Sequence, residues 1–352
     1  MIEWRTRSSP RRRRAAAVVV DVTTSRRPGD GGHASASGGD MTMPNSTVSY
    51  QESRLQASDG LMLHMHTWRP ADTHAPLRAV VAIVHGMGEH GARYASLAGH
   101  FASLGIATVA YDLRGHGRSG GSRLFVKQFD EYLDDTEIFL TQVRTTFGPT
   151  PLFLLGHSMG GAIAALYAIT RAPANVRGLM LSSPALGPGE PVAPWMMAAG
   201  RWVSRWLPKV PVFKVDPALI SRDKRVVEAA RQDPLNAYRG TPARTAAELL
   251  DAMARIHANA DALQLPLYVF HGTADRLTAP WASEQFHGNA GSKDKTLRLY
   301  PGGFHETLND LDRQTVIDEL TQWLLRHLPD APSTAAAPSV PRQAALGAHG
   351  NG

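Results

Sequence analysis

Residues 151–161 have the sequence PLFLLGHSMGG, and this stretch decides the fold. Its first half is an apolar run of strand length, and a helical pattern follows it up to Thr170. Between the two lies a G-x-S-x-G motif, Gly156 to Gly160, in a strand–turn–helix context. The serine of such a turn has a strained backbone, and the flanking glycines allow other backbone segments to approach closely. The sequence therefore predicts that Ser158 is a nucleophile raised above the edge of a sheet.

Short apolar runs alternate with longer helical patterns on both sides of this turn. Most of the apolar runs are nearly continuous, as expected for strands whose two faces are both covered. This alternation predicts an α/β fold with a mostly parallel central sheet flanked by helices. The predicted strands are 79–84, 106–112, 151–155, 176–182, 266–270 and 296–300, and the clearest helical patterns are 94–104, 129–147 and 316–324.

One interval interrupts the alternation. From about residue 184 to 264 the sequence has helical patterns and prolines but no convincing strand. An insertion of this size between two strands, at the carboxyl edge of a sheet, is expected to lie above the site. We therefore predict a helical cap inside one domain that spans residues 48–330.

The composition is that of a globular protein and excludes several classes of site. The chain has 352 residues, of which 43% are apolar and 19% charged. It has no cysteine, which excludes disulfides, thiol nucleophiles and cysteine-ligated metals and gives no reason to expect an oxidising compartment. No apolar run approaches the roughly 20 residues that cross a bilayer. We expect a cytoplasmic protein.

Both tails differ in composition from the domain. Residues 1–47 mix Arg, Gly, Ser and Ala without periodicity, and residues 331–352 are rich in Ala, Pro and Gly, so we predict that both are disordered. An export signal is the alternative for the first tail, but its apolar stretch, Ala15 to Val20, is shorter than the roughly 7–15 residues required. We favour a flexible extension, or an upstream start ahead of Met41 or Met43.

The basic charge also belongs mainly to the first tail. Eight arginines and four acidic residues precede Met41, so most of the formal net charge of +6 lies there. No aromatic platform or recognisable nucleic-acid-binding module accompanies these arginines. We expect no nucleic-acid partner.

A serine nucleophile needs a base and a group that orients the base. A serine hydroxyl is a poor nucleophile by itself, and in this type of fold the partners follow in the order Ser, acid, His, each just past a strand end. Asp275 follows the predicted strand 266–270, and His305 follows the strand 296–300 and a loop with two glycines. Later histidines lie in helical patterns or in the tail. The predicted catalytic triad is Ser158, Asp275 and His305.

The developing negative charge of an acyl-transfer reaction needs backbone donors that are already in position. One donor is predicted to be the N–H group of Met159, the residue after the nucleophile. The other is predicted to be the N–H group of Met87, in the loop HGMG (85–88) after the first strand of the predicted parallel sheet. Met87 and Met159 are therefore the candidate oxyanion hole.

Further short motifs lie along the chain. They are HGMGEH (85–90) with RY (93–94), DLRGHGRS (112–119), SRD (221–223), DPL (233–235), ADRL (274–277) and KTL (295–297). Together with the 156–161 motif they resemble the monoacylglycerol lipases and related lysophospholipases, over roughly Ser49 to Leu328. The resemblance implies the α/β-hydrolase fold, a mobile cap that guides an acyl chain to the serine, and a polar end of the site for glycerol.

Two residues match the polar-end positions of that family, and one departs from it. The resemblance implies that Glu89 and Arg93 bind the head group; the alternative is an ion pair that supports the oxyanion loop. Mammalian members of the family carry a second histidine just past the catalytic one, where this chain has Leu308.

The cap has one segment of mixed aromatic and basic character. Trp195, Trp202 and Trp206 fall on one face of a predicted helix, with Arg201 and Arg205 between them. Such a helix can enter a lipid interface, which would give transient membrane contact through the cap and a peripheral location. We favour the alternative, in which the stripe lines an acyl tunnel or packs on the body.

The predicted reaction is hydrolysis of medium- or long-chain monoacylglycerols through an acyl-enzyme. The nearest alternatives are a lysophospholipase and a general carboxylesterase, which use the same triad. Cofactor-free haloperoxidases share the triad but not the large insertion, epoxide hydrolases and dehalogenases place an acid where Ser158 stands, and a non-catalytic receptor would not need all three triad residues. No phosphate loop, metal cluster or dinucleotide fingerprint is evident, so we predict no cofactor and no metal.

Overall fold

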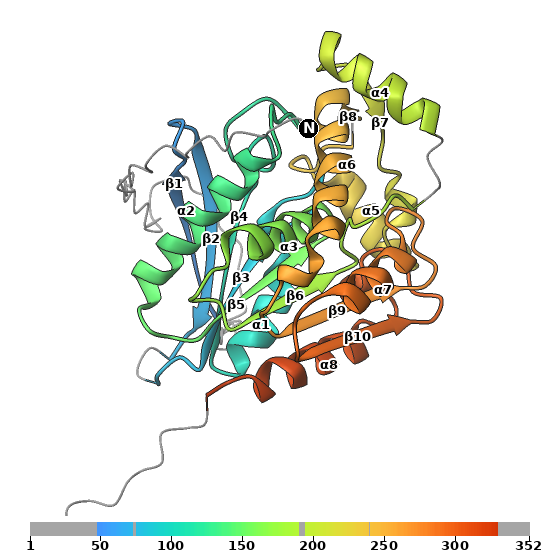
Figure 1. Cartoon of the computed structure of the whole chain (residues 1–352). Coiled ribbons are helices and arrows are strands. Elements are labelled where there is room, and N and C mark those ends of the chain that lie inside the picture. Colours follow the sequence, from blue (N-terminus) through green and yellow to red (C-terminus); the bar gives the residue numbers. More distant parts are fainter. Residues whose placement is uncertain (1–47, 73–74, 190–193, 239, 330–352) are drawn as a thin grey trace, which may run out of the picture.

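The computed structural model describes residues 48–72, 75–189, 194–238 and 240–329, with no side-chain description for 194–198. The two tails predicted to be disordered, 1–47 and 331–352, lie outside the described residues. The rest forms a central sheet with helices on both sides and a smaller unit above one end (Figure 1).

The central sheet has eight strands in the order β1-β2-β4-β3-β5-β6-β9-β10. β2 is antiparallel to both β1 and β4, and all other neighbours pair in parallel. All six strands predicted from apolar runs are confirmed, with small shifts at their ends. The strands are β1 (Val48–Gln56), β2 (Met62–Pro70), β3 (Ala79–Val84), β4 (Ile106–Tyr111), β5 (Leu152–His157), β6 (Gly178–Ser182), β9 (Leu267–Gly272) and β10 (Lys295–Tyr300).

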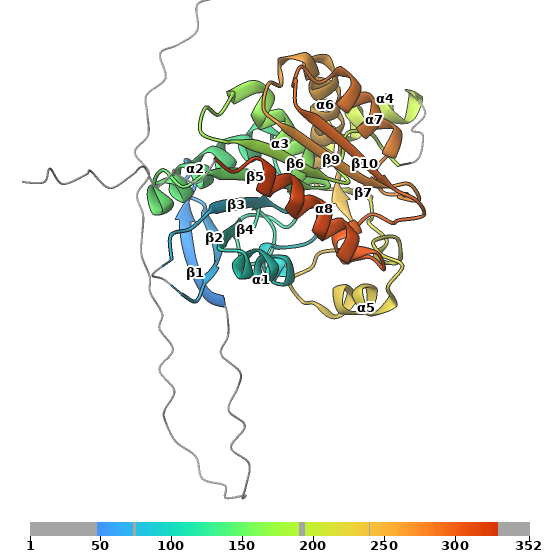
Figure 2. The ribbon, with the colours of Figure 1, turned by 90° about the horizontal axis from the view of Figure 1, so that it is seen from below.

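Helices cover both faces of this sheet (Figure 2). One face packs on α1 (Ala95–Ser103) and α8 (Arg313–Arg326). The other packs on α2 (Asp130–Phe147), α3 (Met159–Arg171), α6 (Ala243–Ala258) and α7 (Pro280–Asn289). β3 to β6 and β9 are buried along their whole length, which explains their continuous apolar sequences. The predicted mostly parallel α/β architecture is correct.

The part of the insertion between β6 and α6 forms the smaller unit above the carboxyl ends of the strands (Figure 1). It contains α4 (Pro194–Trp206), α5 (Lys224–Gln232) and two short strands, β7 (Pro211–Phe213) and β8 (Thr241–Pro242). The expectation of no strand in this interval was therefore wrong. β7 and β8 pair antiparallel with each other and escaped prediction because each contains a proline, which usually marks a break.

Short 3₁₀ helices complete the chain: η1 (Gly91–Tyr94), η2 (Pro217–Leu219), η3 (Ala260–Ala262) and η4 (Thr307–Asn309). Among the residues that the structure describes, none of the helices combines the length and apolar character needed to cross a bilayer.

Candidate active site

Ser158 lies in the turn between β5 and α3. Its backbone has φ 53° and ψ −120°, which residues other than glycine rarely adopt. Its carbonyl oxygen accepts hydrogen bonds from the N–H groups of Ala162 and Ala185, at 3.2 and 2.8 Å. Gly160 permits this turn, because a Cβ atom there would collide with the carbonyl oxygen of Val84. The turn leaves Ser158 half-buried at the carboxyl end of β5.

Asp275 and His305 form a hydrogen-bonded pair at the same end of the sheet. Asp275 follows β9 and His305 follows β10, and these two strands are parallel neighbours. His305 Nδ1 lies 2.7 Å from Asp275 Oδ2, and both side chains are buried. Since Nδ1–H donates to the carboxylate, Nε2 carries the lone pair that can accept a proton.

Three more residues fix the carboxylate of Asp275. Its Oδ2 atom also lies 2.9 Å from His271 Nε2 and accepts from Thr278 Oγ1 at 2.8 Å. Its Oδ1 atom accepts from the backbone N–H groups of Leu277 and Thr278, at 2.8 and 3.1 Å. With donors on both oxygens, the carboxylate has one preferred orientation toward His305.

The electrostatics of the pair favour a charged acid and a more basic imidazole. Burial alone would raise the pKa of Asp275, but the nearby His305 and the hydrogen bonds from His271 and His305 lower it below its usual value. Burial alone would lower the pKa of His305, but the charge of Asp275 and its hydrogen bond raise it. His305 is thus a stronger base than an isolated histidine.

The serine turn and the imidazole lie side by side. The ring of His157, the residue before Ser158, is 4.8 Å from the ring of His305, measured between centroids. Burial, followed by the neighbouring His305, lowers the pKa of His157 to about 4, so His157 is neutral at pH 7. The three predicted triad residues therefore converge on one edge of the sheet, from three separate strand ends.

The predicted oxyanion loop adjoins the serine. Gly86 is so close to Ser158 that a Cβ atom added at Gly86 would lie 3.0 Å from Ser158 Cβ. Within the described chain, no backbone hydrogen bond outside the helices and strands uses the N–H group of Met87 or Met159. Met159 opens α3, and the first N–H groups of a helix have no partner inside it. Both amides are available for a developing oxyanion.

A buried ion-pair network supports this loop. Glu89 accepts from the Gly86 N–H group at 2.6 Å and from the Tyr94 hydroxyl at 3.0 Å. Arg93 donates to Glu89 at 2.8 Å and makes two parallel hydrogen bonds of 2.7 Å to Glu306. Burial would raise the pKa of Glu89, but Arg93, then His157, lower it to about 2. These contacts fit the ion-pair alternative for Glu89 and Arg93; head-group binding stays a prediction.

The cap is bonded to two of the loops around the candidate site. Asp233 of the cap lies 2.8 Å from His90 Nε2, beside the oxyanion loop. Arg222 of the cap bonds Asp310 through Nε at 2.8 Å, and Asp310 in turn accepts from the N–H group of Phe304 at 2.9 Å. The SRD and DPL motifs of the sequence are thus anchors that join the cap to the loops around the site.

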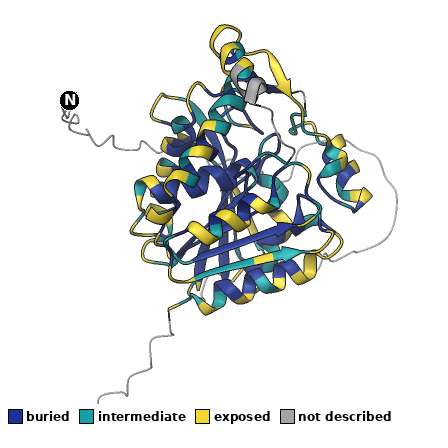
Figure 3. Ribbon diagram, turned by 45° about the vertical axis from the view of Figure 1, so that its right-hand side comes forward, coloured by how far each residue is buried: buried dark blue, intermediate teal, exposed yellow. Residues whose placement is uncertain are grey.

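The aromatic face of the cap is exposed to solvent. Trp202 and Trp206 of α4 are 62% and 64% exposed, and Phe213 of β7 is 48% exposed. Figure 3 colours exposed residues yellow. Trp195 lies outside the residues whose side chains are described. We predicted that this stripe lines an acyl tunnel or packs on the body; packing on the body is wrong for Trp202 and Trp206, and the tunnel stays a prediction.

Sequence reasoning missed several supporting residues. His271 and Thr278 form hydrogen bonds with Asp275, and Glu306 forms them with Arg93. None of these three residues belongs to a recognisable sequence motif. A weak signal was present for His271, a polar residue near the end of a mostly apolar strand. Glu306, next to His305, carried no comparable signal.

Comparisons with known proteins agree with this geometry. Residues 75–312 match the family described as Serine aminopeptidase, S33. A monoacylglycerol lipase of Mycolicibacterium smegmatis is 34% identical over 76% of this chain and 95% of its own length. A monoglyceride lipase of Homo sapiens is 32% identical over 83% of this chain and 96% of its own length. A crystal structure of Paleococcus ferrophilus monoacylglycerol lipase superposes with a TM-score of 0.68 and 29% identity, over 75% of this chain and 99% of that one.

The family match covers more than half of the chain, and this chain covers at least 95% of the length of each of the two relatives. The chain therefore belongs to the monoacylglycerol lipase and lysophospholipase family of serine hydrolases, carboxylic ester hydrolases with the α/β-hydrolase fold.

Proposed function

We propose that this protein hydrolyses monoacylglycerols to free fatty acid and glycerol through an acyl-enzyme. The observation that carries the proposal is the buried 2.7 Å hydrogen bond between Asp275 and His305, beside the strained turn of Ser158. The relatives named for this activity are matched over 95% and 96% of their own length, which supports the proposal.

The proposed reaction has two half-reactions. Ser158 Oγ attacks the ester carbonyl while His305 Nε2 takes its proton, and the N–H groups of Met87 and Met159 stabilise the oxyanion. His305 then returns the proton to the leaving glycerol. Water repeats the sequence on the acyl-enzyme, and the fatty acid leaves.

One depression on the cap borders the oxyanion loop. A depression of about 650 Å³ lies in the cap, lined by Lys214, Asp216, Pro217, Arg231 and Tyr238. It adjoins the oxyanion loop, because the residue before Tyr238 donates its N–H group to the Gly88 carbonyl oxygen at 2.8 Å. A volume of several hundred Å³ is typical of sites for small ligands. We propose that the substrate reaches Ser158 from this side.

The role of the serine can be tested with one substitution and one control. We expect Ser158→Ala to fold normally but to lose ester hydrolysis and labelling by a fluorophosphonate. Ser103→Ala, at the exposed end of α1, should keep both. Labelling of Ser158→Ala at the wild-type rate would mean that another residue is the nucleophile.

The leaving group is tested with a substrate panel. Release of fatty acid is measured for 1-oleoylglycerol, oleoyl lysophosphatidylcholine and p-nitrophenyl butyrate. We expect the highest kcat/KM for the monoacylglycerol. A higher value for the lysophospholipid or for the short ester would identify the lysophospholipase or the general carboxylesterase instead.

We also propose that the exposed face of α4 touches membrane surfaces, which would give the protein a peripheral location in the cytoplasm. Trp202 and Trp206 are largely solvent-exposed, and two arginines of the same helix, Arg201 and Arg205, are exposed beside them. Aromatic side chains on one face with basic residues nearby are typical of interfacial helices.

Flotation with vesicles that contain anionic lipid tests this contact. We expect Trp202→Asp to reduce the bound fraction strongly. The matched control is Trp281→Asp, which changes a tryptophan of α7 that is 58% exposed but lies outside the cap. Equal binding of both variants and the wild type would remove the membrane role of the cap.

A further inference from the structure

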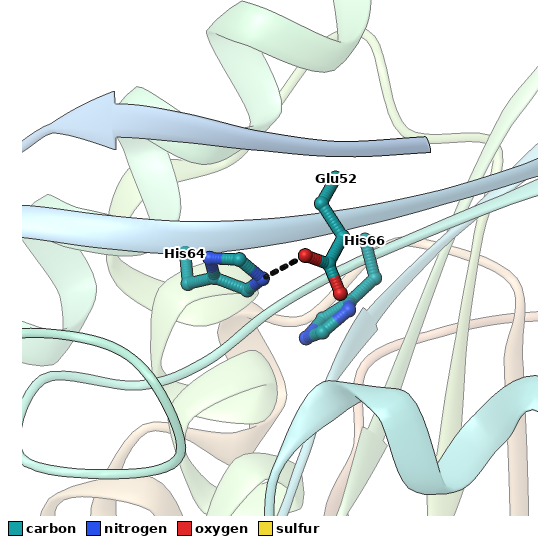
Figure 4. Close-up of side chains that lie close together, drawn as sticks. All are labelled: Glu52, His64 and His66. Carbon is teal, nitrogen blue, oxygen red and sulfur yellow. Dashed lines mark ion pairs between the residues drawn. The ribbon is translucent and has the colours of Figure 1, made fainter. Parts of the chain in front are cut away.

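Two histidines and a glutamate meet on the β1–β2 edge of the sheet, away from the serine turn (Figure 4). His64 and His66 are two residues apart on β2, so their side chains point to the same face. The antiparallel register pairs Glu52 of β1 directly with His66. One ligand atom from each of the three residues lies within 4.8 Å of the other two.

One of these ligand atoms, His64 Nε2, is buried and has no hydrogen-bond partner among the described residues. Its nearest carboxylate atom, Glu52 Oε2, is 3.6 Å away, which is too long for a hydrogen bond. A buried polar atom without a hydrogen bond costs about 1–3 kcal/mol, and this one lies within 4.8 Å of ligand atoms of Glu52 and His66.

The Nδ1 atom of His66 can coordinate a metal ion, because Nε2 carries the proton. Its Nε2 atom lies 3.1 Å from Asp112 Oδ1, so Nε2–H donates to a buried carboxylate. This leaves a lone pair on Nδ1, as in the carboxylate–histidine pairs that surround many metal ions. The Tyr50 hydroxyl lies 2.8 Å from this Nδ1 atom and also 2.8 Å from Glu52 Oε1. One hydroxyl proton cannot serve both acceptors.

We propose that Glu52, His64 and His66 bind a divalent cation of intermediate softness, with Zn²⁺ as the representative ion. Two imidazoles and one carboxylate are a donor set that suits zinc, and solvent can supply the fourth ligand because the Glu52 side chain is 39% exposed. Zinc bonds of about 2.1 Å require ligand atoms about 3.4 Å apart. The 3.6 Å distance between His64 Nε2 and Glu52 Oε2 nearly meets this spacing. His66 Nδ1 would be the third ligand once it gives up its hydrogen bond with the Tyr50 hydroxyl.

The neighbouring charges set the strength of the site. Arg118 donates to Glu52 Oε1 at 2.5 Å. A bound metal ion would therefore share the Glu52 carboxylate with the Arg118 guanidinium. Arg54 is opposite His64 in the register and is exposed. Binding therefore uses Glu52 Oε2, the oxygen that faces His64, while Oε1 keeps Arg118.

An ion at this position would join the edge strand β1 to β2. It would also be linked to the start of η1, because Asp112 Oδ1 accepts both from His66 and, at 2.7 Å, from the N–H group of Gly91. The proposed role is stabilisation of the fold, and hydrolysis at Ser158 does not require the ion.

The test uses the full chain after treatment with a chelator and dialysis. Zn²⁺ binding is measured by calorimetry, Co²⁺ binding by its visible ligand-field absorption, and stability by thermal melting with and without Zn²⁺. We expect one tight equivalent in the wild type and a higher melting temperature with Zn²⁺. Glu52→Gln and His64→Gln should weaken this equivalent by at least about 100-fold, the upper limit for losing only an outer-shell contact.

Two further variants make the result specific. His100→Gln changes a histidine of α1 outside the cluster and should keep the tight equivalent. Arg118→Gln removes the competing cation and should tighten binding by up to about fivefold, the effect of one exposed ion pair. If His64→Gln does not fold, the result for Glu52→Gln decides whether the cluster binds the ion, because Glu52 is exposed and its replacement should leave the fold intact. Tight binding that survives Glu52→Gln, or weaker binding in Arg118→Gln, would overturn the proposal.

Discussion

Replacing Asp275 by Asn tests whether the orientation of His305 depends on a single carboxylate oxygen. The new amide has two orientations. With its nitrogen at the Oδ1 position it faces the backbone N–H groups of Leu277 and Thr278, which cannot change their protonation. With its nitrogen at the Oδ2 position it faces His305, His271 and the Thr278 hydroxyl, all of which can become acceptors. The second orientation is therefore preferred.

In that orientation the amide donates to Nδ1 of His305, and the imidazole proton moves to Nε2. His305 then has no lone pair toward Ser158 and cannot take its proton. Wrong tautomers of this kind reduce kcat by about 10⁴-fold, equivalent to about 5 kcal/mol of transition-state stabilisation. The pKa of His305 should also fall in this variant, because the charge that raises it is lost.

The assay follows the release of fatty acid from 1-oleoylglycerol by Asp275→Asn between pH 5 and pH 9, with circular dichroism as the check of folding. The matched control is Asp294→Asn, which changes a surface aspartate that lies 2.8 Å from His327 and is remote from the serine turn. The control should keep wild-type kcat. A folded Asp275→Asn enzyme with kcat within tenfold of the wild type would refute the assignment of Asp275 and the tautomer argument.

Three other predictions concern protonation and packing. Because the pKa of His305 is raised above 6.5 and only neutral His305 can act as a base, kcat/KM should fall as the pH drops through a midpoint above 6.5; a midpoint near 4 would implicate another group. Glu89→Gln should lower the free energy of unfolding by about 2–3 kcal/mol, since it weakens hydrogen bonds to a charged group. The pKa of Glu89 is lowered to about 2, so its contribution is present above about pH 4.5 and lost as the pH falls toward 2, and denaturant melts of the variant should show less of this loss. Gly160→Ala should prevent correct folding of the serine turn, whereas Gly99→Ala, in α1 with open space around it, should stabilise the protein by about 0.5–1 kcal/mol in the same melts.

The sequence was most informative where strands are fully buried. Runs such as 79–84 and 152–155 are apolar on both faces, so they predict strands without knowledge of their neighbours. β1 and β2 gave no such signal, because β1 is largely exposed and β2 carries two histidines and a threonine. Their identity as strands depends on pairing with each other and with β4, which is a property of the assembled sheet.

The candidate site divides in the same way. The positions of Ser158, Asp275 and His305 at strand ends on one edge of the sheet were predictable, because the expected chemistry fixes their types and the fold fixes their order. The residues that hold them, including Thr278 and Glu306, act through contacts between loops that are distant in sequence. The Glu52–His64–His66 cluster was equally hidden, since it exists only in the register of β1 on β2.

The helix α6 belongs to two parts of the molecule at once. At its start, the N–H group of Ala243 donates to the cap at Val210, and further along Met253 and Ile256 are buried in the core that α3 also enters. A chimaera that exchanges caps between relatives should therefore be joined after Ser183 and before Ala243, with α6 left on its own scaffold. A junction at residue 264 would replace α6 together with the cap. Substrate specificity could then be transferred only if the contacts between α6 and α3 were repacked.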